Sequence, residues 1–245
     1  MKKLFIFFIL SATLLSANTI NIAVAANVSY AMDELIAEFN KTHKETKVRV
    51  TLGSSGKLTA QIKHGAPYHI FMAANMKFPQ SLYDDKIAKN APVIYALGSL
   101  AILSQEPKDM SKGIELLKGN EIHKIAIANP KTAPYGTAAM EAFRSAGIYE
   151  DIKDKLIFAE SISQTVSFAI TAADIGLIAK SSLYSKTMLK YKENSNWVEV
   201  NPTLYTPIEQ GIVMIEEDKE TKAFYDFILS QSARDIFLKY GYLLP

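Results

Sequence analysis

The feature that most limits what this chain can fold into is a repeated order of short apolar strand, polar turn and amphipathic helix. Residues 47–52 alternate apolar with other side chains, as a strand does, and Val48, Val50 and Leu52 share one face. After a serine-rich turn, residues 58–62 begin a helical run that stops at Gly65-Ala66-Pro67. Strands that alternate with helices along the whole chain predict an α/β fold with mostly parallel sheets.

Four polar turns connect a strand to a helix in this pattern. They contain Ala26-Asn27, Ser54-Ser55, Tyr135-Gly136 and Ser161-Ile162-Ser163. In open α/β sheets, ligands bind at the carboxyl ends of the strands, where such turns lie. The first N–H groups of a helix lack acceptors within it and carry the positive end of its dipole. The turns therefore predict an anion site, although Ser54 or Ser55 could also serve only as a helix N-cap.

The apolar stretch at residues 91–103 is interrupted at Gly98-Ser99, and we interpret Gly98 as lying near a crossing into a second domain. Two of the polar turns precede Gly98 and two follow it. This arrangement is expected if two α/β lobes face each other across a cleft and each presents two helix starts to one ligand.

Residues 1–17 are predicted to be a secretory signal peptide, with a basic start at Lys2 and Lys3, an apolar run and a small-residue cleavage site at Leu15-Ser16-Ala17. The run is short for a membrane span, so an uncleaved anchor is the weaker alternative. The chain has no cysteine, which excludes disulfides and a cysteine-linked lipid. We expect export to a bacterial periplasm and no membrane insertion of the mature chain.

The charge balance gives no indication of a nucleic-acid partner. The full chain has 27 Lys and Arg and 25 Asp and Glu, and loss of Lys2 and Lys3 with the signal peptide leaves 25 of each. The basicity of the precursor therefore says nothing about binding to nucleic acid or to an acidic membrane.

Five segments, in order, resemble the molybdate-binding proteins of bacterial ABC importers. They are Ala25-Ala26-Asn27-Val28-Ser29-Tyr30-Ala31-Met32, Gly53-Ser54-Ser55-Gly56-Lys57-Leu58-Thr59-Ala60-Gln61-Ile62, Gly65-Ala66-Pro67, Ala128-Asn129-Pro130 with Ala133-Pro134-Tyr135-Gly136, and residues 223–242. The resemblance implies a two-lobed periplasmic binding protein of type II, with two crossover strands near residues 97–98 and 208–209. Residues 18–97 and 209–245 would form lobe I, and residues 98–208 lobe II.

The resemblance also implies which residues hold the tetrahedral oxyanion. They are the backbone of Ala26, the side chain and backbone of Asn27, the hydroxyl and backbone of Ser55, the side chain of Tyr135 and the backbone of Ile162. Some members have an alanine in place of Tyr135 and a tyrosine in place of Ala179, so this chain supplies its phenol from a different loop. Molybdenum would be present only within the oxyanion, and no cofactor or free metal ion is expected.

Other residues are interpreted as structural. Similar proteins usually have aspartate at the positions of His69 and Asn75, so any bracing of loops by those acids is altered here. His43, His64, His69 and His123 do not form a metal-ligand pattern. Tyr225, Tyr240 and Tyr242 near the C-terminus are interpreted as packing residues.

The leading hypothesis is a transport receptor, not an enzyme, which as a monomer captures molybdate or tungstate and presents it to a membrane permease. A sulfate- or phosphate-binding protein of the same architecture is the first alternative. A protonated phosphate needs an acceptor, whereas the expected contacts are donors. A secreted hydrolase with Ser54 or Ser55 as nucleophile is less favoured, because a base is required and no histidine is close to the four turns in sequence.

Overall fold

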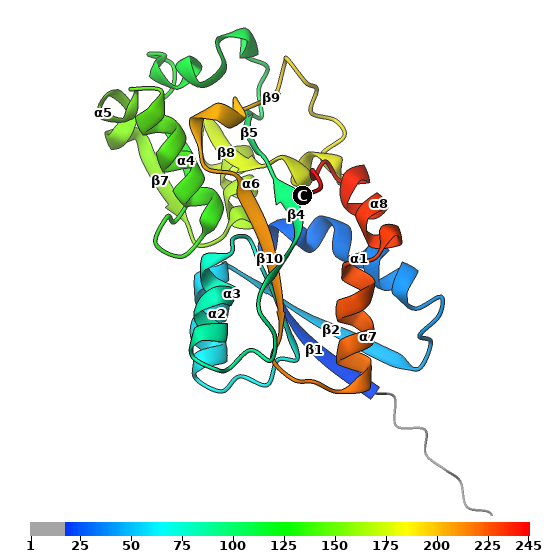
Figure 1. Ribbon diagram of the computed structural model, residues 1–245. Coiled ribbons are helices and arrows are strands. Elements are labelled where there is room, and N and C mark those ends of the chain that lie inside the picture. The colour runs from blue at the N-terminus through cyan, green and yellow to red at the C-terminus, as the bar shows by residue number, and fades with distance from the viewer. Residues whose placement is uncertain (1–17) are drawn as a thin grey trace, which may run out of the picture.

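The computed structural model describes residues 18–245, so the predicted signal peptide at residues 1–17 lies outside the described residues. The described chain forms two lobes, each built on a five-stranded sheet. In Figure 1 the chain completes most of one lobe, builds the other, and then returns through β10 to the first. The predicted two-lobed α/β architecture is confirmed.

The sheet of the first lobe has the strand order β2-β1-β3-β10-β4. Its strands are β1 (Asn18–Ala25), β2 (Thr46–Gly53), β3 (Ile70–Ala73), β4 (Val93–Gly98) and β10 (Ile208–Met214). Strand β1 pairs in parallel with β2 and β3, whereas β10 is antiparallel to both β3 and β4. Only β10 therefore runs against the other strands.

The sheet of the second lobe has the order β7-β6-β8-β5-β9. Its strands are β5 (Leu100–Leu103), β6 (Ile125–Ala128), β7 (Leu156–Ala159), β8 (Ile175–Ala179) and β9 (Trp197–Glu199). Strand β6 is parallel to β7 and β8, and β5 is antiparallel to β8 and β9. Each sheet is thus mostly parallel, with one strand reversed next to a lobe crossing.

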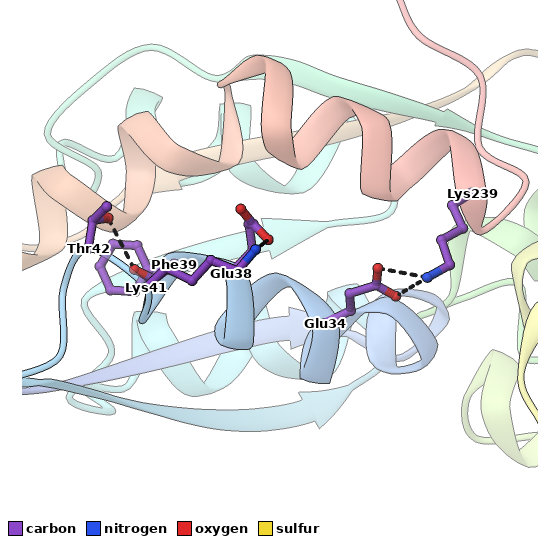
Figure 2. A network of polar contacts seen from close by, with 6 residues as sticks. All are labelled: Glu34, Glu38, Phe39, Lys41, Thr42 and Lys239. Atoms are coloured by element: carbon purple, nitrogen blue, oxygen red, sulfur yellow. Dashed lines mark hydrogen bonds and ion pairs between the residues drawn. The ribbon is translucent and has the colours of Figure 1, made fainter.

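Helices cover both faces of the first sheet. They are α1 (Ser29–Phe39), which follows the 3-10 turn η1 (Ala26–Val28), α2 (Ser55–Lys63), α3 (Lys77–Asp84), α7 (Lys219–Ile228) and α8 (Gln231–Lys239). Helices α1, α7 and α8 share one apolar core with the sheet, and α2 and α3 share another on the opposite face. Figure 2 shows the Lys239 ammonium of α8 bonded to both carboxylate oxygens of Glu34 on α1, at 2.8 Å.

The second sheet is covered in the same way. Its helical segments are η2 (Met110–Lys118), α4 (Pro134–Ser145), α5 (Tyr149–Ile152), η3 (Lys153–Lys155), α6 (Ile162–Thr171), η4 (Lys180–Tyr184) and η5 (Pro202–Leu204). Along β5, Leu100 and Ile102 pack toward α4, whereas Ala101 and Leu103 pack toward α6. Burial on both faces explains the continuous apolar run in the sequence.

Two helices begin earlier than the sequence pattern indicates, and this matters for the site. Helix α4 starts at Pro134, before the predicted turn residues Tyr135-Gly136, because proline fits the first helical position, where no N–H bond is lost. Helix α6 starts at Ile162, within the predicted turn Ser161-Ile162-Ser163. Tyr135 and Ile162 therefore belong to first helical turns.

Helix α3 and strand β9 are among the elements that the sequence did not predict, and one side chain lies elsewhere than expected. Helix α3 contains Pro79, which interrupts its pattern, and β9 has only three residues. Leu52, expected on the apolar face of its strand, is 50% exposed, because β2 is the edge strand of its sheet.

The chain passes from the first sheet to the second between β4 and β5 and returns at β10. We predict that residues 18–97 and 209–245 form one lobe and residues 98–208 the other. The exact residues at which the lobes begin and end stay a prediction. Across residues 18–245, no helix has the length and apolar character needed to cross a membrane.

Candidate anion-binding site

A small cavity lies between the two lobes. Its lining residues come from strand ends and helix starts of both lobes: Ala25, Ala26, Asn27, Gly53, Ser54, Ser55, Ala74, Ala133, Pro134, Tyr135 and Ile162. The structure therefore brings together all of the residues proposed for the site, which are Ala26, Asn27, Ser55, Tyr135 and Ile162. Topology explains this, because parallel strands place their following turns at one edge of each sheet.

The first residues of η1, α2, α4 and α6 all line this cavity. None of these segments has an acidic residue in its first turn, and only α6 has a capping side-chain bond, from Gln164 N–H to Ser161. Acids are otherwise favoured at helix starts, where they offset the dipole. The N–H groups of these first turns have no acceptor inside their helices, so they can bind an anion.

Ser55 contributes a hydroxyl as well as a helix start. Its side chain is 1% exposed, and its Oγ accepts a hydrogen bond from Ala74 N–H at 2.9 Å. The hydroxyl proton remains free to donate to a ligand.

Ser54 occupies the N-cap position of α2, but its side chain makes no capping bond. Its buried Oγ has no partner among residues 18–245. Neither serine side chain therefore acts as a helix cap, which is the alternative to a ligand site at this turn.

Asn27 is fully buried, and its amide is already engaged. The Nδ2 group donates to Gln210 Oε1 at 2.8 Å and to Tyr242 Oη at 2.9 Å. An amide nitrogen has two protons to donate, so none remains for a ligand. The side-chain contact implied by the family resemblance is not available in this arrangement, which leaves the backbone N–H of Asn27 as its possible contact with a ligand.

The Tyr135 phenol lies deep between the lobes. The residue is 1% exposed, its hydroxyl lies beside the Asn27 side chain, and a Cβ atom at Gly98 would lie 2.1 Å from its Oη. Burial raises the pKa of Tyr135 well above its ordinary value, and the nearby phenols of Tyr242 and Tyr95 add to this effect. The phenol therefore keeps its proton and remains a neutral donor.

The lining contains no lysine, arginine, histidine, aspartate or glutamate. Lys57, two residues after Ser55, forms an ion pair with Glu160 of the other lobe, and these side chains are 54% and 60% exposed. Water screens such an exposed pair. Uncharged donors and helix dipoles thus define the electrostatics of the cavity.

The two lobes also touch directly around the cavity. Gly56 N–H donates to Thr132 O at 2.9 Å, and Ser163 Oγ donates to Ala26 O at 2.8 Å. Each bond joins a cavity-forming loop of one lobe to one of the other. The lobes are therefore held in contact at two points near the cavity.

Asn75 and His69, for which the family resemblance leads us to expect aspartates, have local bonding roles. Asn75 Oδ1 accepts from Phe78 N–H at the start of α3, at 3.2 Å. His69 Nδ1 accepts from Asn21 N–H at 3.0 Å. Both side chains brace backbone, and within the described chain no group of three metal-binding side chains is present.

Gln210, Tyr242 and Ser181 are polar residues around the site that sequence reasoning misses, and the Ser181 hydroxyl donates to Asn27 O at 3.1 Å. The sequence favours a packing role for Tyr242, and its ring does lie against Phe237, with centroids 5.5 Å apart. Gln210 is fully buried in the structure. A polar residue within an apolar strand is the sequence signal that could have identified it as part of the site.

Two α/β lobes joined by chain crossings, with a small cavity between them that has no charged side chain in its lining, define a solute-binding protein. Residues 20–243 match the family of bacterial extracellular solute-binding proteins, and this chain belongs to that family. The molybdate-binding protein ModA of Rhodobacter capsulatus is 35% identical over 93% of this chain and 89% of its own length. ModA of Azotobacter vinelandii is 33% identical over 92% of this chain and 90% of its own length.

Solved structures agree with this assignment. The periplasmic molybdate-binding protein of Azotobacter vinelandii has a TM-score of 0.84 and 28% identity, and covers 92% of this chain and 99% of its own. A sulfate-binding protein of Mycobacterium tuberculosis, with 13% identity, a TM-score of 0.74 and coverage of 92% and 86%, shares the fold alone.

Proposed function

We propose that this protein is a periplasmic receptor that binds molybdate, and also tungstate, and delivers it to the permease of an ABC importer. The observation that carries the proposal is the cavity lined by four helix starts and containing no charged side chain. The two ModA relatives bind molybdate by name, which supports the choice among oxyanions.

The proposed contacts are the backbone N–H groups of Ala26, Asn27, Ser55 and Ile162, with the hydroxyls of Ser55 and Tyr135. All of these are neutral donors, and a hydrogen bond to a charged group contributes roughly 1.5–3 kcal/mol. Because the donors are fixed by their helices, they need no reorientation when the ligand enters. Such a site favours a fully ionised dianion.

Sulfate is the principal competitor, since it has the same charge and shape. Phosphate is less suited, because near neutral pH it carries a proton that requires an acceptor. A hydrolase is not favoured either, because no histidine or carboxylate lines the cavity beside Ser54 and Ser55. We propose a monomeric receptor without catalysis or cofactor, exported through cleavage of residues 1–17.

Calorimetric titration of residues 18–245 with molybdate, tungstate, sulfate and phosphate tests the proposal. We expect one ion bound per chain, with molybdate and tungstate bound more tightly than sulfate and no measurable phosphate binding. Tighter binding of phosphate than of molybdate, or no binding of any of the four ions, would overturn it.

A further inference from the structure

The C-terminal segment after α8 returns to the junction of the two lobes. Gly241 has φ +74°, which turns the chain, and Leu243 then pairs antiparallel with Leu97 of β4. Leu97 N–H donates to Leu243 O at 2.7 Å, and Leu243 N–H donates to Leu97 O at 2.9 Å. The C-terminus is drawn beside this junction in Figure 1. The tail is therefore fixed to a strand that ends where the chain crosses between lobes.

From this segment the Tyr242 side chain reaches Asn27 at the cavity. Tyr242 is 2% exposed, and its hydroxyl donates to Asn27 O at 2.9 Å. The same oxygen accepts from Asn27 Nδ2 at 2.9 Å. The phenol therefore binds Asn27 at two points, one on the backbone and one on the side chain.

Gln210 of β10 holds the same asparagine from another direction. Its Oε1 accepts the second amide proton of Asn27 at 2.8 Å, and its Nε2 donates to Ile208 O at 2.9 Å. The second bond fixes which end of the Gln210 amide faces Asn27. Both proton-donating positions of the Asn27 amide are thus used to hold the residue in place.

We propose that Tyr242 and Gln210 are positioning residues of the anion site, which act through Asn27 and touch no ligand themselves. They fix the peptide that presents the Ala26 and Asn27 N–H groups to the cavity, and they connect it to the tail and to the returning strand. This inference rests on the proposed function. Burial raises the pKa of Tyr242, so the hydroxyl keeps the proton that it donates to Asn27.

The test compares Tyr242→Phe with Tyr95→Phe. Both tyrosines are buried and both rings lie against Phe237, at 5.5 and 5.2 Å. The Tyr95 hydroxyl, however, has no hydrogen-bond partner among the described residues. Titration with molybdate at 25 °C should show roughly 3- to 30-fold weaker binding for Tyr242→Phe, as for other positions that modulate a site without contact. Tyr95→Phe should bind within twofold of the unsubstituted protein.

A double-mutant cycle separates positioning from general structure. In an Asn27→Ala background, Tyr242→Phe should have a smaller effect on affinity, because its bond to the Asn27 amide is already gone and only its bond to the carbonyl of residue 27 is left to lose. A purely structural role would lower the melting temperature yet leave the dissociation constant at 25 °C unchanged. Gln210→Met, which keeps the side-chain volume and loses the acceptor, should weaken binding in the same direction as Tyr242→Phe.

The outcomes are distinguishable. Equal affinities of the unsubstituted protein and Tyr242→Phe, equal losses in Tyr242→Phe and Tyr95→Phe, or full additivity with Asn27→Ala would each overturn the inference alone. Failure of the unsubstituted protein to bind molybdate, tungstate or sulfate would overturn the proposed function and the inference with it.

Discussion

At the scale of single residues, substitution of Ser55 distinguishes a site made of neutral hydrogen-bond donors from one in which a charged side chain binds the anion. Ser55→Ala removes the free hydroxyl proton, leaves the backbone N–H, and deprives Ala74 N–H of its acceptor. We expect binding of molybdate to weaken by about 10- to 100-fold without being abolished. Calorimetric titration measures this change.

Lys57→Ala is the matched control on the same helix. Its exposed partner is Glu160, and an exposed ion pair contributes about 0.2–1 kcal/mol, so affinity should fall by no more than about fivefold. If Lys57→Ala abolished binding and Ser55→Ala left it intact, the anion would be bound through the charge of Lys57, and the proposal that neutral donors bind it would be wrong.

Tyr135 gives a second prediction at this scale. Tyr135→Phe removes a buried hydroxyl that lies beside the Asn27 side chain, so the ligand loses a donor. Ala179, at the end of β8, offers no substitute phenol. We expect affinity to fall by about 10- to 100-fold with little change in melting temperature. Unchanged affinity would show that the hydroxyl faces Gly98 and not the ion.

At the scale of elements, the absence of acids from the helix starts around the cavity can be tested at α6. Ser161→Asp keeps a good N-cap, so the stability of the helix should change little. The new carboxylate would compete with the ligand for the dipole of the same helix start. Binding should weaken by roughly 3- to 30-fold at low salt, and less at high salt. Titrations at two ionic strengths, with Ser161→Asn as the neutral control, check this expectation.

Unlike the helical segments that begin at the cavity, helix α7 has an acidic residue, Asp218, at its N-cap. Asp218 accepts from Glu220 N–H and Thr221 N–H, at 3.0 and 2.9 Å. Burial raises the pKa of Asp218, but hydrogen bonds from Thr221 and Glu220 outweigh burial and hold this pKa below its ordinary value. A carboxyl whose pKa is depressed on folding stabilises the protein above its unfolded pKa, and that stability is lost as pH falls through the folded value.

Asp218→Ala should therefore lower the free energy of unfolding by about 1 kcal/mol near pH 7. The difference from the unsubstituted protein should shrink below about pH 4, where the unfolded carboxyl becomes protonated. Urea titrations near pH 7 and below about pH 4 measure this difference in the free energy of unfolding. Asp226→Ala, which breaks the exposed i,i+4 pair with Lys222, is the control and should cost less at either pH. A pH-independent loss in Asp218→Ala would contradict the role of its charge.

At the scale of the whole molecule, a ligand enclosed by two lobes must enter while they are apart, so binding should close them about the two chain crossings. Small-angle scattering should give a smaller radius of gyration with molybdate than without it. The direct bonds from Gly56 to Thr132 and from Ser163 to Ala26 belong to the closed arrangement. An unchanged radius in the presence of proven binding would contradict this expectation.

Paired spin labels test which residues move together. The chain has no cysteine, so two can be introduced without background. We propose that residues 98–208 move as one body against residues 18–97 and 209–245. Labels at Asp84 and Glu150 should change separation on binding, and labels at Asp84 and Glu217 should not.

The sequence alone determined the class of fold and the identity of the turns around the cavity. Alternation of strands and helices is a local pattern, and a parallel sheet brings turns from distant segments to one edge whatever their side chains are. Ala26, Asn27, Ser55, Tyr135 and Ile162 can therefore be grouped from the order of residues along the chain, with the family resemblance selecting them from the turns.

Only the tertiary structure decided how those residues are used. The Asn27 amide is bonded to Gln210 and Tyr242, which are 183 and 215 positions away in sequence, and no local pattern carries such pairings. The position of the Tyr135 hydroxyl against Gly98 likewise depends on how the two lobes pack. Periodicity encodes which face of an element is buried, whereas the partner of a buried polar group depends on the three-dimensional path of the whole chain.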